Sequence, residues 1–161
     1  MNHHPTLRFR IAERGDGEII LNFIKELAKY EKLEHEVTAT VATLEEWLFD
    51  KLSAEVFFAM VEDKEVGFAL YFTNFSTFIG KAGIYIEDIF VLEQYRGQGI
   101  GKAMLKYFAR MAVECDFGRV EWSCLDWNED SIEFYNRLGA HAMDEWTTYR
   151  LSGDELIALA N

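Results

Sequence analysis

The stretch "VLEQYRGQGIGKAMLKYF", Val91 to Phe108, carries three glycines at alternate positions just before a helix-forming pattern. Glycine inside a helix costs roughly 1 kcal/mol relative to alanine, so this spacing requires a reason. Without side chains, Gly97, Gly99 and Gly101 let the backbone approach a ligand and direct the unpaired N–H groups of the first helical turn at it. Arg96 adds a bidentate phosphate donor. The stretch therefore predicts a pyrophosphate-binding loop at the start of a helix.

Two familiar phosphate loops do not fit this stretch. A Walker loop has glycine five residues before "GK", where this chain has Arg96. The dinucleotide fingerprint G-x-G-x-x-G, started at Gly97, requires glycine at the position of Lys102. The plain structural alternative is a glycine-rich helix entry needed only for tight packing. It leaves three glycines and the arginine beside them unexplained.

Composition and charge exclude several classes of protein. The 161 residues are 50% hydrophobic and carry a formal net charge of −12. We expect one globular domain over residues 1–161, in a reducing cytoplasm, with Cys115 and Cys124 as free thiols. The acidic balance disfavours nucleic acid and anionic membranes as partners and favours a cationic one. The apolar runs are too short to span a bilayer and the histidines lack metal-ligand spacing, so neither a membrane nor a metal is expected.

The order of predicted elements indicates a mixed α/β sheet. Strands are predicted over "LRFRIAE", "EVFFAMV", "VGFALYFT", "AGIYIEDIFVL", "RVEWSCL" and "EWTTYRL". Helices are predicted after Asp16, after a capping box opened by Thr43 in "TLEE", after the glycine stretch, over "NEDSIEFYNRLGA", and after Ser152. Because a helix joins two strands around residues 99–114, one parallel crossover is expected in an otherwise largely antiparallel sheet.

Four stretches together resemble a known family. "YRGQGIG" matches the signature R/Q-x-x-G-x-G/A of the GNAT superfamily of acyl-CoA-dependent N-acetyltransferases. With "IKELAKYE", "YIEDIFV" and "WNEDSIEFYNRLGA", the chain resembles the spermidine/spermine (diamine) acetyltransferase branch, including its thialysine-acetylating relatives, over about residues 8–151. The resemblance implies flanking helices and a splayed central strand pair that holds acyl-CoA. It also implies acetyl-CoA as cosubstrate, a small cationic amine as acceptor, and a homodimer.

The resemblance assigns a set of residues to acetyl-CoA. The loop is expected to bind the pyrophosphate, and Val91 to offer its backbone N–H to the thioester carbonyl. Ile89 and Phe90 are expected to flank the pantetheine arm. Asn128 contacts the cofactor or is an ordinary helix cap, and both roles can coexist. The full set is Ile89, Phe90, Val91, Arg96, Gly97, Gln98, Gly99, Ile100, Gly101, Lys102, Asn128 and Tyr135.

Acetyl transfer to an amine requires a base for the ammonium and an acid for the leaving thiolate. By resemblance, Tyr135 is the acid that faces the coenzyme A sulfur; the alternative is a core aromatic. Glu87 is the candidate base or water-holder and contacts the amine; the alternative is an ion-paired strand residue. Strand alternation points Glu87 and Asp88 to opposite faces, and we expect Asp88 to be structural.

Further residues are expected around the amine. Tyr30 and Glu31 match the polyamine-contacting pair of the branch, with a solvated helix end as the alternative. Glu121 is expected to add negative charge, whereas Thr147 aligns with a substrate-binding acid of the branch and departs from it. The sequence thus predicts an enzyme that acetylates a primary amine by direct attack in a ternary complex. A non-catalytic acyl-CoA-binding regulatory module and a protein N-acetyltransferase are the alternatives.

Overall fold

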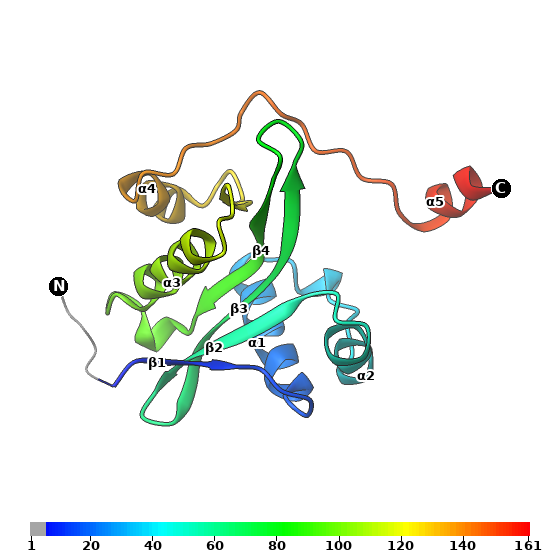
Figure 1. The fold of residues 1–161 in the computed structure, drawn as a ribbon. Coiled ribbons are helices and arrows are strands. Elements are labelled where there is room, and N and C mark those ends of the chain that lie inside the picture. Colours follow the sequence, from blue (N-terminus) through cyan, green and yellow to red (C-terminus); the bar gives the residue numbers. More distant parts are fainter. Residues whose placement is uncertain (1–5) are drawn as a thin grey trace. The chain divides into compact units, whose positions relative to one another are not determined.

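A computed structural model describes residues 6–161 of the chain (Figure 1). His3 and His4 lie outside these residues. The chain divides into two compact units, one ending at Ser123 and the other running over Cys124–Asn161. The single domain expected over residues 1–161 therefore stays a prediction. Across residues 6–161, no helix has the length and apolar character needed to cross a membrane.

The first unit is built on a five-stranded sheet with the strand order β1-β2-β3-β4-β5. The first four strands are antiparallel neighbours, and β5 runs parallel to β4. The strands are β1 (Arg8–Ile11), β2 (Glu55–Val61), β3 (Lys64–Ser76), β4 (Lys81–Val91) and β5 (Val120–Trp122). Helix α3 (Ile100–Glu114) joins the two parallel strands. The predicted mixed sheet and its parallel crossover are confirmed.

Helices cover both faces of this sheet (Figure 1). On one face, Phe23 of α1 (Gly17–Tyr30) stacks on Phe68, with the ring centroids 5.1 Å apart. On the other face, Phe108 of α3 packs on Phe57, also at 5.1 Å. Since neighbouring residues of a strand face opposite sides, both layers are filled by "EVFFAMV", whose Phe57 and Phe58 are fully buried. Burial on both faces explains why this strand is apolar at nearly every position.

Helix α2 (Val41–Glu45) is capped three residues before Thr43, which was predicted as its N-cap. Its N-cap is Thr40, whose hydroxyl accepts the N–H of Thr43 at 3.1 Å. The hydroxyl of Thr43 in turn accepts the N–H of Thr40 at 3.0 Å, which completes a capping box. The predicted start was wrong because a threonine hydroxyl here takes the part that Glu or Gln usually plays. A π-helical turn, η2 (Glu46–Asp50), follows directly.

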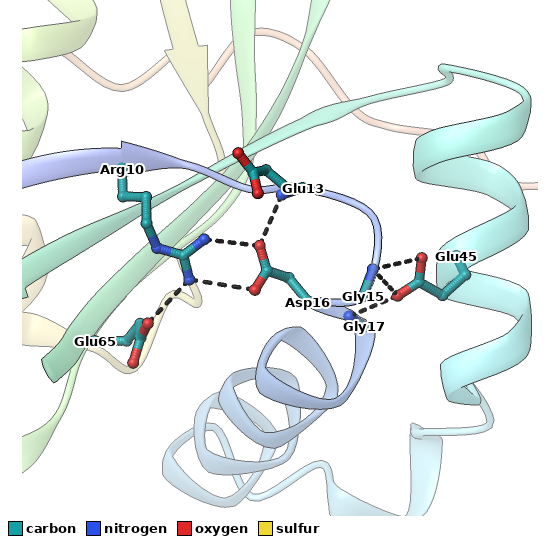
Figure 2. A network of polar contacts seen from close by, with 7 residues as sticks. All are labelled: Arg10, Glu13, Gly15, Asp16, Gly17, Glu45 and Glu65. Carbon is teal, nitrogen blue, oxygen red and sulfur yellow. Dashed lines mark hydrogen bonds and ion pairs between the residues drawn. The ribbon is translucent and has the colours of Figure 1, made fainter.

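The start of α1 is held by a hydrogen-bond network that includes a carboxylate from α2 (Figure 2). Asp16 is the N-cap as predicted, but its carboxylate accepts Arg10 of β1 at 2.8 Å and no helix N–H. Glu45 of α2 accepts the N–H groups of Gly15 and Gly17 instead, both at 2.9 Å. A Cβ on Gly17 would lie 2.8 Å from that carboxylate oxygen, so a larger residue at position 17 would have to displace the Glu45 side chain. The acid therefore fixes α1 against α2.

The second unit contains helices α4 (Glu129–Arg137) and α5 (Gly153–Ala160). Asn128 caps α4 as predicted, its side chain accepting the N–H of Ser131 at 3.3 Å. Gly139 follows the helix with a φ of 92°, the left-handed conformation typical of a helix end.

The strand predicted over "EWTTYRL" is wrong, because no strand follows β5 within residues 6–161. Trp146 and Tyr149 of this stretch are 71% and 92% exposed. A strand exists only where a second strand pairs with its backbone, and this stretch pairs with no strand among residues 6–161. The sequence of this stretch is therefore typical of a strand, but the strand does not form without a neighbour to pair with.

Candidate active site

The glycine stretch forms a loop of N–H donors at the N-terminus of α3. Gly97 and Gly99 have φ values of 75° and 82°, which glycine adopts without strain. The first helical N–H with a partner belongs to Ala103, which donates to Gly99 at 3.0 Å. For the N–H groups from Gly97 to Lys102, the described chain offers no hydrogen-bond partner. Such a run of donors at the positive end of a helix is an anion-binding site.

Gly101 is explained by neither backbone conformation nor packing. It lies in α3 without a positive φ, and a Cβ added to it would meet nothing within 4 Å. The fold alone would therefore accept a side chain there. A ligand that approaches the backbone closely gives the missing reason for glycine.

The other side chains of the loop differ in how far they are buried. Ile100 is buried against the sheet, Gln98 is half-buried and Lys102 is exposed. Arg96, expected to bind phosphate, donates its Nε–H to the carbonyl of Val91 at 2.9 Å. Its terminal N–H groups have no hydrogen-bond partner among residues 6–161, so the phosphate role remains a prediction.

Strand β4 has an open edge beside this loop. Pairing with β5 ends at Ile86 opposite Trp122, whereas β4 continues to Val91. The N–H of Leu92 donates to Val66 on the β3 side at 2.9 Å. Because successive residues of a strand direct their N–H groups to opposite edges, the N–H of Val91 points to the side that β5 leaves open. This divergence is the splayed strand pair that was expected.

Side chains of the predicted pantetheine contacts differ in burial. Phe90 is 7% exposed and packs in the core on the α1 face, so its backbone is what remains for a cofactor. Ile89 is half-buried. Both contacts with the cofactor stay predictions.

A β-bulge changes where the two adjacent acids of β4 lie. The register passes from Leu70 opposite Asp88 to Tyr71 opposite Ile86, which leaves Glu87 as the extra residue. Two residues of one strand then face one of its neighbour, and strict alternation is lost. Alternation along β4 therefore no longer fixes the side to which Glu87 points, and the expectation that Glu87 and Asp88 face opposite sides stays a prediction. Glu87 is exposed and Asp88 is half-buried.

Three carboxylates interact at this end of the sheet. Burial, together with the negative charges of Glu87 and Glu31, raises the pKa of Asp88 to about 7. Burial also raises the pKa of Glu31, which follows the last residue of α1. Because burial and like charge both disfavour ionisation, a cation among these groups would be stabilised. Asp88, expected to be structural, thus joins the acidic cluster, and its place beside Glu87 in an apolar strand was the signal.

Tyr30 and Glu31 do not form a solvated helix end. Both are half-buried, and the Tyr30 ring lies 4.7 Å from the Arg96 guanidinium carbon. Glu121 is less available than expected, because Arg119 pairs with it at 2.8 Å and Asn74 donates to it at 3.2 Å. Its charge is therefore compensated locally.

The remaining predicted residues belong to the second unit. Tyr135 is half-buried on α4, with its ring centroid 5.6 Å from that of Phe134. Asn128 has the helix-cap role, and the contacts of both residues with a cofactor stay predictions. Among residues 6–161, no group of His, Cys, Asp and Glu is arranged to hold a metal ion.

An open sheet edge beside a loop of N–H groups without protein partners is an arrangement suited to an extended anionic ligand. The chain belongs to the acetyltransferase (GNAT) family, which it matches over residues 20–140. This membership confirms the family expected from the glycine loop.

Similar proteins of known activity indicate the branch of the family to which the chain belongs. The chain is 36% identical over 167 residues to thialysine N-epsilon-acetyltransferase of Mus musculus, covering 96% of this chain and 98% of that protein. It is 32% identical over 203 residues to L-ornithine N5-acetyltransferase NATA1 of Arabidopsis thaliana, covering 98% and 89%. Among solved structures, an integron cassette protein of V. cholerae aligns with a TM-score of 0.79 at 27% identity, covering 96% and 98%. The expected diamine acetyltransferase branch is confirmed.

Proposed function

We propose that this chain transfers an acetyl group from acetyl-CoA to a primary amine of a small cationic substrate, which is a diamine, a polyamine or a thialysine-like amine. The observation that carries the proposal is the run of unpaired N–H groups from Gly97 to Lys102 beside the open edge of β4. A pyrophosphate requires such donors, because a chain of net charge −12 offers an anion no general attraction. The family and the named relatives support an amine as acceptor.

The amine is proposed to bind among Glu31, Glu87 and Asp88. An alkylammonium of pKa about 10.4 must lose a proton before it attacks, which costs about 4.6 kcal/mol at pH 7. Glu87, exposed at the bulge, accepts that proton directly or through a water. Glu31 and Asp88, with Tyr30 beside them, hold the remaining positive charge of the substrate.

The neutral amine then attacks the thioester carbonyl directly. A C–N bond forms, and the oxyanion accepts the N–H of Val91. The C–S bond breaks as Tyr135 gives its hydroxyl proton to the leaving sulfur, and the products are the N-acetylamine and coenzyme A. Both chemical roles follow from the family resemblance, while the edge of β4 that β5 leaves open supports the role of Val91.

A panel of amines tests the proposal. Acetyl-CoA is mixed with diamines, polyamines, lysine analogues, aminoglycosides or a lysine-containing peptide, and thiol release is followed together with product mass. Rapid acetylation of the small diamine-like amines is expected, and Tyr135→Phe should lower kcat by roughly 10²–10⁴ with little change in acetyl-CoA affinity. The matched control is Tyr107→Phe, which removes a hydroxyl from a ring packed on Phe9 and Phe57.

Two other outcomes would each replace the proposal. Tight acetyl-CoA binding with no acceptor in the panel would indicate the non-catalytic acyl-CoA-binding module. Acetylation of the peptide in preference to the small amines would indicate the protein N-acetyltransferase. An unchanged kcat in Tyr135→Phe, with chemistry rate-limiting, would return Tyr135 to a packing role.

We also propose that the protein is a cytoplasmic homodimer. The acidic composition and the two free cysteines agree with a reducing compartment. Large apolar side chains of the second unit are exposed in the single chain, which supports a partner that covers them; they include Trp146, Tyr149, Leu156, Ile157 and Leu159.

A further inference from the structure

One side chain, that of Arg96, joins three parts of the proposed active site. Its Nε–H donates to the carbonyl of Val91 at the end of β4, at 2.9 Å. Its guanidinium carbon lies 4.7 Å from the ring centroid of Tyr30 and 5.0 Å from that of Phe90. The residue itself opens the glycine loop. Arg96 therefore contacts the loop, the end of β4 and the end of α1 at the same time.

Apart from the buried Ile100, the loop residues from Gly97 to Gly101 have few side-chain contacts. A Cβ added to Gly97 or Gly101 would meet nothing within 4 Å, so these positions make no side-chain contact and have no neighbour that crowds them. Within residues 6–161, the Gln98 side chain donates one hydrogen bond, to the carbonyl of Gln94 at 3.5 Å. The contacts of Arg96 with Tyr30 and Phe90 therefore provide a direct side-chain link between the start of the loop and the end of α1.

The end of α1 that Arg96 touches carries the proposed amine contacts. Tyr30 is the last residue of α1, and Glu31 follows it. The two rings that receive the guanidinium, Tyr30 and Phe90, lie 6.3 Å apart at 60° and form a corner into which a planar cation fits. A guanidinium held by a hydrogen bond and two rings has one preferred position, so movement of the loop is passed to this corner.

We propose that Arg96 is a positioning residue that couples occupancy of the glycine loop by acyl-CoA to the affinity of the site for the amine. This inference rests on the proposed function. Phosphate bound by the N–H groups from Gly97 onward fixes the loop, and Arg96 then fixes Tyr30 and Glu31. By thermodynamic reciprocity, the amine raises the affinity for coenzyme A by the same factor.

Hydrogen exchange tests the structural half of this coupling without needing an amine. The N–H groups of Glu31 and Leu33 donate to Leu27 and Ala28 at 2.9 and 2.8 Å, and they exchange when the end of α1 opens. Coenzyme A should slow their exchange about tenfold in the wild type and less than twofold in Arg96→Ala. Equal protection in both proteins would overturn the inference.

Calorimetry tests the functional half, with thialysine and spermidine as amines and coenzyme A as the loop ligand. Saturating coenzyme A should raise amine affinity about tenfold in the wild type, within the usual range of coupling between sites. Arg96→Ala and Tyr30→Leu should each reduce that factor to below twofold, and the double variant should add nothing further. Arg96→Gln, which keeps a donor for Val91, should restore part of it.

The outcomes separate the two claims. If the wild type acetylates amines but Arg96→Ala weakens only coenzyme A binding, in a salt-dependent way, Arg96 is a phosphate donor alone and the inference is overturned. If the coupling survives Tyr30→Leu, the contact with α1 has no such role. If the wild type binds coenzyme A and accepts no amine, the proposed function fails, although the exchange result still decides whether Arg96 links the loop to α1.

Discussion

The three glycines of the loop are glycine for different reasons. Gly97 and Gly99 have positive φ, so the loop conformation itself requires them. Gly101 has neither a positive φ nor a close neighbour, so only a ligand would limit the size of the side chain there. A side chain at Gly99 would strain the backbone. If such a variant lost ligand binding, the cause could be either the altered loop conformation or a steric clash with the ligand. Gly101 is the position that separates folding from binding.

Gly101→Leu should stabilise the protein while weakening acetyl-CoA binding. Leucine stabilises a helix by up to about 1 kcal/mol relative to glycine. Its side chain would also occupy the space in which the ligand contacts the loop backbone. We expect a raised Tm together with an affinity for acetyl-CoA at least tenfold lower, measured by calorimetry. Gly101→Ala is the matched control, because the family signature admits alanine there, and it should keep near-normal affinity. Undiminished affinity in the folded leucine variant would contradict the loop assignment.

Asp88 makes the stability of the protein depend on pH. Its pKa is about 7 in the folded chain against an ordinary value of 3.8. Between these values the folded state holds a proton that the unfolded state has released, so the free energy of unfolding falls as pH rises from about 4 to about 7. The full difference corresponds to an effect on the order of 4 kcal/mol.

Asp88→Asn should remove most of the decrease in the free energy of unfolding between about pH 4 and about pH 7. The variant should then be more stable than the wild type above pH 7. Urea unfolding at several pH values measures this directly. Glu26→Gln, a neutralisation on the exposed side of α1, controls for net charge and should keep the wild-type slope. Parallel pH profiles for the wild type and Asp88→Asn would mean that the carboxyl ionises normally in the folded chain.

At the scale of elements, the carboxylate of Glu45 joins α2 to the start of α1. It accepts the N–H groups of Gly15 and Gly17, and hydrogen bonds to a charged acceptor are worth more than neutral ones. Glu45→Ala should lower the free energy of unfolding by about 2 kcal/mol because both N–H groups lose their acceptor. The neighbouring Glu46 pairs with Lys51 on the surface, so Glu46→Ala should cost below about 1 kcal/mol. Equal losses in urea unfolding would show that the anchor contributes nothing beyond a surface ion pair.

Local patterns predicted those elements whose causes are local. The continuous apolar run of "EVFFAMV", the glycine-to-helix transition and the cap at Asn128 are local signals, and each element was found. The strand over "EWTTYRL" failed because a strand depends on a partner that its own residues do not reveal.

The same reason limits what could be predicted of the site. The residues of the loop were found because glycine spacing is a local signal. The bulge at Glu87 arises from the pairing of β3 with β4, so alternation along one strand could not indicate that its register is interrupted there. The contact of Arg96 with Tyr30 joins residues 66 positions apart, by subtraction of their numbers, and no pattern in either stretch indicates it.

At the scale of the whole molecule, the exposed apolar residues of the second unit predict a two-fold dimer. Light scattering at micromolar concentration should give about twice the chain mass of 18.7 kDa. Tyr149→Asp should shift the protein toward the monomer, because it places a charge on a 92% exposed aromatic position of the proposed interface. The control is Phe78→Asp, an equally exposed aromatic on the turn between β3 and β4. An 18.7 kDa particle for the wild type would contradict the dimer.

The acidic character of the molecule bears most directly on its substrate. With Glu31, Glu87 and Asp88 in one cluster, a second positive charge on the amine should strengthen binding by roughly 0.5–1 kcal/mol per contact, and salt should weaken that gain. The most direct test is acetyl-CoA-dependent thiol release with 1,4-diaminobutane and with butylamine at low ionic strength. The account predicts N-acetylation of both, with a several-fold higher kcat/KM for the diamine that narrows as salt rises. Acetyl-CoA binding without thiol release from either amine, or from any amine of the panel, would contradict it.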